Sequence, residues 1–170
     1  MDSKDELIAV VQRLVDKSEI VDVLHRYARG IDLLDRVAYE SCFHDPVEVA
    51  FPTWRGEVRV LTPLEWTDYC WRLAVGFDAT QHSLSNHFIE FQGHDEATCL
   101  SYLRARHHFT DPQMESYIAG GHYMHDLVRT DEGWKIRRWR FVMTWEQGDP
   151  GAFKVAMSRP GRTDIGSAKA

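Results

Sequence analysis

Apolar residues near the N-terminus recur at helical spacing, but in two stripes that do not share one register. Both stripes fit the i, i+3, i+4, i+7 pattern of an amphipathic helix, and they fail to join across residues 16–18. We therefore predict a short helix, a break, and a second helix over residues 18–30. The first stripe consists of Leu7, Val10, Val11 and Leu14, and the second of Ile20, Val23, Leu24, Tyr27 and Ile31.

Candidate end signals fit this division. Asp16 with Glu19 three positions later resembles a capping box, which would start the second helix. Gly30 is the residue type that most often follows a helix C-terminus. Asp32 would then lie just beyond the helix, five residues after Tyr27.

The next segment mixes short elements with turns. We predict a short helix over residues 35–42, a turn at Asp45-Pro46, and a short strand over residues 47–51, where apolar and polar positions alternate. A loop carrying Trp54 follows. Thr62 is expected to cap a third helix, whose apolar face includes Leu73 and Phe77.

From residue 81 onward the apolar period changes to two. Four long strands are predicted, with turn residues between them, and short connections make them an antiparallel meander. We therefore expect one domain over residues 1–147 and a tail over residues 148–170 that lacks periodicity. The predicted strands span residues 81–92, 96–109, 116–130 and 133–146.

Helices first and a meander second predict an α+β fold. Long twisted strands would form a half-open cone, with the helices packed on its concave side. The chain has 170 residues, which fits one domain, and an unusual number of rings: six Trp, eight Phe, six Tyr and nine His. Such a cone is filled by rings, by a ligand, or by both.

Net charge, the N-terminal residues and the cysteines restrict the expected partners and cellular location. A net charge of −6 argues against nucleic acid, so the basic run over residues 135–140 is interpreted as the paired, outward-facing charges of a strand. No apolar stretch predicts a membrane span, and the first residues do not resemble a secretory signal. Three widely spaced cysteines, Cys42, Cys70 and Cys99, predict reduced thiols in a cytoplasmic protein.

The histidines do not form a simple metal site. Adjacent residues of a strand point to opposite faces, as do residues separated by any odd number. His107 and His108, His122 and His125, and His82 and His87 all fall in that class. No standard metal, nucleotide or nucleophile motif is present either, so we predict no metal and no cofactor.

Asp32 and His82 are the informative candidates for chemistry. A carboxylate bonded to one imidazole nitrogen fixes the tautomer and leaves the other nitrogen able to accept a proton. Taken alone, Asp32 fits a helix cap and His82 fits a structural histidine better than either fits a catalytic role. Spacing cannot join them, because fifty residues separate them.

Several segments resemble the SnoaL-like branch of the NTF2-like superfamily. The resemblance covers roughly residues 5–146 and is more specific for the fold than for any reaction. The closest patterns are those of scytalone dehydratase, hexachlorocyclohexane dehydrochlorinase and bile-acid 7α-dehydratase. The segments are residues 26–32 (RYARGID), 42–49 (CFHDPVEV), 55–56 (RG), 80–90 (TQHSLSNHFIE), 120–123 (GGHY) and 131–136 (DEGWKI).

The resemblance implies a catalytic Asp–His dyad inside the cone. It assigns the carboxylate to Asp32, the general base to His82 and a further catalytic role to Tyr27, which equally fits plain core. It leaves open which residue donates a proton to the leaving group. The implied substrate-binding residues are Trp54, Leu73, Phe77, Asn86, Leu103, Ala105, His107, Ala119, Gly121 and Tyr123.

The leading functional hypothesis is a cofactor-free lyase that performs a dehydratase-type elimination on a cyclic, largely apolar small molecule. An isomerase or an aldol-type cyclase would use the same first proton abstraction, and a non-catalytic small-molecule binding protein is the non-enzymatic alternative. The resemblance also implies a homo-oligomer, dimer or trimer, through the outer sheet face. That face is expected to carry Arg104, Arg106, His122 and Met124.

Overall fold

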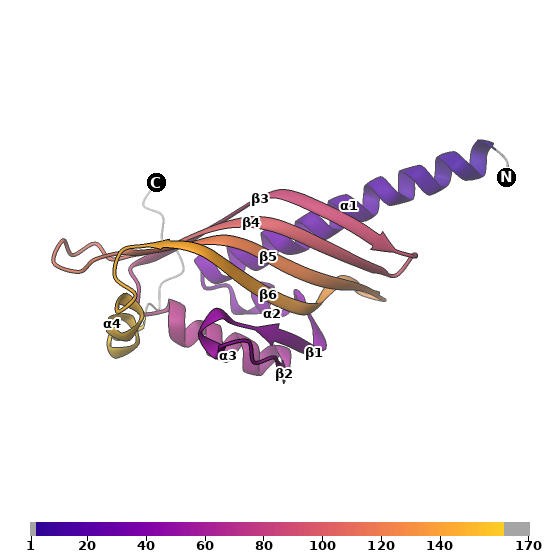
Figure 1. Ribbon diagram of the computed structural model, residues 1–170. Helices are drawn as coiled ribbons and strands as arrows, with labels where there is room; N and C mark the ends of the chain where they lie inside the picture. Colours follow the sequence, from indigo (N-terminus) through magenta and orange to yellow (C-terminus); the bar gives the residue numbers. More distant parts are fainter. Residues whose placement is uncertain (1–2, 162–170) are drawn as a thin grey trace, which may run out of the picture.

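A curved six-stranded sheet with helices against one face forms the body of the protein (Figure 1). This computed structural model describes residues 3–161. In chain order the elements are α1 (Ser3–Asp32), α2 (Arg36–Glu40), β1 (Phe43–Ala50), the 3₁₀ turn η1 (Pro52–Trp54), β2 (Arg59–Leu61), α3 (Pro63–Ala74), β3 (Ala79–Gln92), β4 (Glu96–His108), β5 (Tyr117–Thr130), β6 (Gly133–Gln147) and α4 (Ala152–Ser158).

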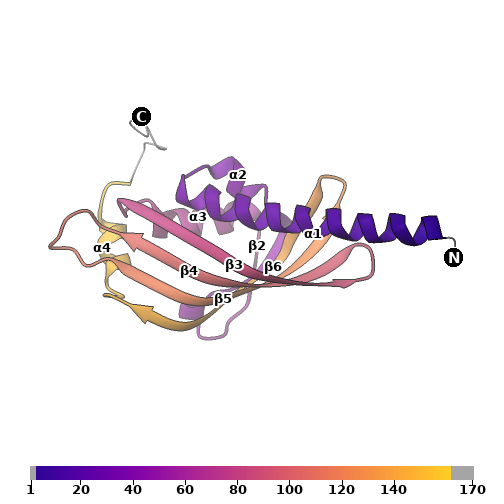
Figure 2. The same ribbon diagram turned by 90° about the horizontal axis from the view of Figure 1, so that it is seen from above.

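The sheet order is β2-β1-β6-β5-β4-β3. Strands β3 to β6 pair antiparallel in succession, which confirms the predicted meander and the α+β class. Strand β1 adds to β6 in parallel, and the three-residue β2, which the sequence pattern did not predict, pairs antiparallel with β1. The helices α1 and α3 lie on the concave side of this sheet (Figures 1 and 2).

The predicted break in the first helix is wrong, because α1 is continuous over 30 residues. No proline or glycine interrupts residues 3–29, so nothing in the backbone forces a break. The two apolar stripes instead lie on opposite sides of one helix. Ile20 comes nine positions after Val11, which is two and a half turns at about 3.6 residues per turn.

The expected end signals in this region also have other roles. Asp16 is buried in the middle of the helix, where its Oδ1 accepts from Gln12 and lies 2.7 Å from a guanidinium nitrogen of Arg129. Gly30 lies inside the helix, which runs on to Asp32. A Cβ at Gly30 would come within 2.8 Å of the main-chain nitrogen of Tyr39. The glycine therefore permits close approach of α2 rather than ending α1.

The predicted cap of the third helix is confirmed. The Thr62 hydroxyl accepts from the backbone N–H of Glu65 at 3.2 Å, and the Glu65 carboxylate accepts from the backbone N–H of Thr62 at 2.8 Å. This reciprocal capping box satisfies two donors at the start of α3. The sequence signal is local, so it survives whatever the rest of the fold does.

The C-terminal segment was expected to be a partly packed or flexible tail, and the sequence pattern did not predict the helix α4 that residues 152–158 form. Ala156 packs so closely on Gly76 that a Cβ there would lie 1.9 Å from the Ala156 carbonyl oxygen. Arg159 fixes the end of the helix by donating to the Gly76 carbonyl at 2.8 Å and to Asp78 at 2.7 Å. Residues 162–170 of the expected tail lie outside the described residues.

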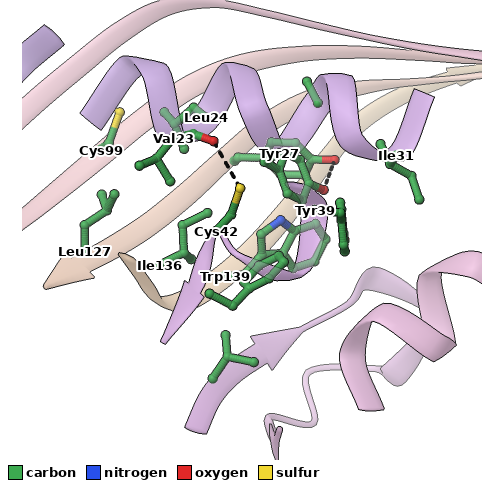
Figure 3. Packing of buried hydrophobic residues seen from close by; sticks show 14 of the residues in the cluster. Val23, Leu24, Tyr27, Ile31, Tyr39, Cys42, Cys99, Leu127, Ile136 and Trp139 are labelled. Atoms are coloured by element: carbon green, nitrogen blue, oxygen red, sulfur yellow. Dashed lines mark hydrogen bonds between the residues drawn. The ribbon is translucent and has the colours of Figure 1, made fainter. Parts of the chain in front are cut away.

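The core lies between α1 and the inner sheet face. Figure 3 shows Val23, Leu24, Tyr27 and Ile31 of α1 packed against side chains of the strands, with Trp139 of β6 beneath them. These α1 residues are the second stripe of the sequence pattern. That stripe accounts for the body-facing side of the helix, whereas the first stripe packs against none of the core.

A β-bulge in β3 changes which histidines face inward. The pairing with β4 shifts between Ser85 and Phe88, and Asn86 has a φ of 52°. The extra residue reverses the alternation, so His82 before the bulge and His87 after it both face the inner side. The expectation that these two point to opposite faces is therefore wrong.

Charged residues of β6 are largely paired with neighbouring acids. Arg138 donates to Glu48 at 2.8 Å and to Asp126 at 2.6 Å, and Arg137 donates to Glu96 at 2.9 Å. This pairing accounts for much of the basic run in the sequence. None of the helices within residues 3–161 has the length and apolar character needed to cross a membrane.

Candidate active site

A cavity of about 480 Å³ lies inside the cone, between the concave sheet face and helices α1, α3 and α4. Its volume falls within the roughly 300–1,000 Å³ of typical small-molecule sites. Eight of the residues expected from the sequence lie on its wall. They are Tyr27, Leu73, His82, Leu103, Ala105, His107, Ala119 and Tyr123.

Asp32 and His82 meet, although fifty residues separate them. Asp32 is the last residue of α1, and His82 lies in β3 where that strand passes the helix end. The Nδ1 of His82 lies 2.7 Å from Oδ1 of Asp32, and the backbone N–H of His82 donates to Oδ2 at 2.7 Å. Both carboxylate oxygens thus hold the same residue. The side chain of Asp32 is 16% exposed and that of His82 is 10% exposed.

This arrangement fixes the protonation pattern of the pair. Burial alone would raise the pKa of Asp32, but hydrogen bonds and charge from His82 outweigh burial and hold that pKa below its ordinary value. An ionised carboxylate only accepts hydrogen bonds, so Nδ1 of His82 carries the proton. His82 itself lines the cavity, and Nε2 is the nitrogen available to a bound molecule.

His107 places a second imidazole beside the first. Its ring centroid is 5.7 Å from that of His82, with the planes nearly perpendicular. Burial, reinforced by the neighbouring His82, lowers the pKa of His107 to about 3, so this ring is neutral at ordinary pH. Its Nδ1 has no hydrogen-bond partner within the described part of the chain, although the ring lines the cavity. This Nδ1 is buried, so His107 contributes ring surface rather than that nitrogen to the cavity wall.

Two tyrosine hydroxyls form a second polar point on the wall. The Tyr27 hydroxyl donates to the Tyr123 hydroxyl at 3.2 Å. Burial raises the pKa of both phenols, so both remain protonated donors. The Tyr123 O–H is left to donate to a ligand oxygen.

Four expected binding residues lie away from the wall. Trp54 packs under the loop and donates to the Tyr69 hydroxyl, while Phe77 is fully buried among Phe109 and Phe153. Gly121 and Asn86 lie at irregular points of β5 and β3, where strand pairing shifts. Gly121 keeps its regular pairing with Leu103 of β4, between Ala119 and Tyr123, but it has no side chain to reach the cavity, whereas Asn86 lies in the β3 bulge.

The sequence argument missed most of the ring-rich wall. Alternation along β6 places Trp139, Phe141 and Met143 on the cavity side, a period-two signal that the apolar Val142 between them weakens. Phe153 and Met157, four residues apart, belong to α4, the helix that was not predicted. The other unpredicted wall residues are Ile31, Tyr39, Phe51, Pro52, Thr53, Trp66, Tyr69, Cys70, Ala74, Tyr117, Glu146 and Pro150.

Glu146 is the one Asp, Glu, Lys or Arg residue among the described residues of the wall. It is exposed, and its Oε2 accepts from the Tyr117 hydroxyl at 2.7 Å. No group of three or more His, Cys, Asp or Glu within residues 3–161 is arranged to hold a metal ion. The wall is otherwise apolar or weakly polar.

Comparisons with known proteins agree with this architecture. Residues 12–140 match the family model of the SnoaL-like domain. The terrestric acid biosynthesis cluster protein E of Penicillium crustosum is 26% identical over 152 residues, which cover 86% of this chain and 94% of that protein.

Solved structures give the same fold at lower identity. A scytalone dehydratase-like protein from Novosphingobium aromaticivorans superposes with a TM-score of 0.71 at 22% identity, covering 81% of this chain and 90% of that one. The hexachlorocyclohexane dehydrochlorinase LinA-type3 from Novosphingobium barchaimii gives 0.68 at 17% identity, with coverage of 83% and 94%.

Proposed function

The chain belongs to the SnoaL-like domain family, and from the contents of its cone we propose that it is an enzyme that removes a proton from carbon with His82 as general base. The finer proposal is a dehydratase-type elimination on a cyclic, largely apolar small molecule. The observation that carries it is the 2.7 Å contact between Asp32 and His82, with His82 in the wall of a cavity of about 480 Å³.

The proposed reaction begins at Nε2 of His82. This nitrogen takes a proton from a carbon next to an activating carbonyl, and the Asp32 carboxylate stabilises the imidazolium that forms. The electron pair moves toward the carbonyl oxygen, where the Tyr123 hydroxyl, held by Tyr27, is suited to donate. Expulsion of a hydroxyl from the adjacent carbon, with return of the proton to it, completes loss of water. The chain's own side chains supply every group that this route calls on.

The wall restricts the class of substrate. Rings and aliphatic side chains make up most of it, and Glu146 is the formally charged group among the described wall residues. Asp32 adds a second negative charge behind His82. A negatively charged ligand would be repelled by both carboxylates, and the apolar wall disfavours desolvating a charge of either sign, so we infer that the substrate is uncharged. Two proteins of similar structure, a dehydratase-like protein and a dehydrochlorinase, support elimination from a small cyclic compound.

Isomerisation and aldol-type cyclisation begin with the same proton abstraction. They differ from elimination in the next step of the carbanion. The substrate determines that step, because elimination needs a leaving group on the adjacent carbon. The non-catalytic alternative needs neither a paired base nor room for a ligand. The intact Asp32–His82 contact beside a cavity of about 480 Å³ favours an enzyme.

Exchange of carbon-bound hydrogen tests the proton abstraction without knowledge of the natural substrate. Neutral cyclic ketones such as 1-tetralone, incubated in heavy water, should exchange their activated hydrogens when the protein is added, as followed by proton NMR. We expect His82→Ala to lower the exchange rate by about 10²–10⁴-fold, and Asp32→Asn to lower it as well.

His44→Ala is the matched control, since His44 lies in β1 and its Nδ1 contacts the Pro46 carbonyl rather than the cavity. Exchange that continues unchanged in His82→Ala would sink the mechanism. Mass spectrometry of the products then separates loss of water from isomerisation.

A further inference from the structure

The N-terminal half of α1 exposes an apolar face that no other part of residues 3–161 covers. Figures 1 and 2 both show this half of the helix running past the ends of the strands. Leu7 and Leu14 are 63% and 62% exposed, and Ile8, Val10 and Val11 are exposed to a similar extent. Scattered exposed apolar residues are ordinary, but a contiguous apolar patch marks an interaction surface.

The helix geometry forces this face outward. Arg13 stacks on Phe91 of β3 at 4.3 Å, and Asp16 pairs with Arg129 at 2.7 Å, so these residues define the side that faces the sheet. Leu7 precedes Asp16 by nine positions, which is two and a half turns, so it lies on the opposite side. At the inner end of this segment, around Arg13 and Asp16, the polar side therefore faces the body, and the apolar side of the segment faces away from it.

We propose that this face, formed by Leu7, Ile8, Val10, Val11 and Leu14, binds the same face of a second copy of the chain, with the two helices antiparallel. Charge favours this occupant. Asp5 and Glu6 lie at the start of the segment and Lys17 at its end. Antiparallel pairing brings Glu6 of each copy toward Lys17 of the other, while Leu7 meets Leu14 near both ends of the contact.

Two other occupants fit less well. A membrane surface attracts helices with an excess of basic residues, whereas residues 3–17 carry three basic and three acidic side chains and the whole chain has a charge of −6. The outer sheet face is a separate surface, on which Tyr102 and Met124 are also exposed. Contact through that face would leave the helix uncovered.

Sedimentation equilibrium of the full chain tests the proposal at protein concentrations of about 1–100 μM. We expect the unchanged protein to self-associate. Val11→Glu should raise the dissociation constant by about 100-fold, because it buries an unpaired charge at the centre of the contact. Val37→Glu on α2, an exposed valine remote from this face, is the matched control and should leave the mass unchanged.

A charge exchange tests the antiparallel arrangement. Glu6→Lys and Lys17→Glu should each weaken association, and the double variant should restore it. A monomer throughout this concentration range refutes the proposal, as does a mass that Val11→Glu leaves unchanged. Binding of a monomeric protein to anionic phosphatidylserine vesicles would also refute it, by assigning the face to a lipid surface.

Discussion

Two buried histidines predict that mild acid destabilises the fold. His107 and His125 are 8% and 1% exposed, and His125 has no hydrogen-bond partner on either ring nitrogen within the described part of the chain. Burial, with smaller contributions from His82 and His87 respectively, lowers the pKa of each ring from 6.5 to about 3. Below pH 6.5 these two histidines therefore bind protons in the unfolded chain but not in the folded protein, and the free energy of unfolding falls as the pH drops toward 3.

The magnitude follows from the two pKa values. Each histidine lowers the free energy of unfolding by about 1.4 kcal/mol for every pH unit below 6.5. Between neutral pH and pH 4.5 the loss is about 2.7 kcal/mol per ring, or about 5 kcal/mol for both. Domains of this size are stable by roughly 5–15 kcal/mol, so the loss is a large fraction of the total.

Urea unfolding at fixed protein concentration, followed by tryptophan fluorescence at about pH 7.5 and pH 4.5, measures this loss. In His125→Phe, which keeps a ring between Tyr27 and Tyr123, the loss should shrink by about half. His122→Phe on the outer side of the same strand controls for the substitution itself. The reasoning fails if His125→Phe and the unchanged protein lose the same free energy between the two pH values.

Three further predictions concern local contacts. Gly76→Ala should displace α4, because the added Cβ would lie 1.9 Å from the Ala156 carbonyl; faster amide hydrogen exchange confined to residues 152–158 would show it. Thr62→Ala should lower the free energy of unfolding by about 1 kcal/mol through loss of the α3 cap, as measured in urea. Tyr27→Phe should slow ketone hydrogen exchange by more than any loss of folded protein explains, since it removes the donor to Tyr123. An unchanged exchange rate would count against a role for the hydroxyl pair.

Local sequence patterns predicted much of the fold. The alternation from residue 81 onward predicted four strands within a few residues of their observed bounds, because the two faces of each strand have different surroundings over most of its length. The Thr62 cap was predictable for a similar reason, since both partners lie within four residues. The α+β class followed from the order of these elements, and the family resemblance agreed with it.

Other features depended on partners that are distant in the sequence. The bulge at Asn86, which turns His87 to the inner side with His82, is a property of strand pairing rather than of either residue. Helix α4 forms where Ala156 meets Gly76, and neither residue signals the other along the chain. The predicted break in α1 is wrong because a change of apolar register does not end a helix unless a residue such as proline or glycine also interrupts the backbone.

The candidate site divides in the same way. The sequence by itself supplied the residue types, including a carboxylate at position 32 and an imidazole at position 82, and resemblance alone suggested that they act together. Only the tertiary structure brings Asp32 at the end of α1 within 2.7 Å of His82 on β3, and only it places His82 in the same cavity wall as the Tyr27–Tyr123 hydroxyls. A hydrogen bond depends on distance in space, which spacing along the chain does not fix. The curvature of the sheet and the packing of α1 across it set that distance.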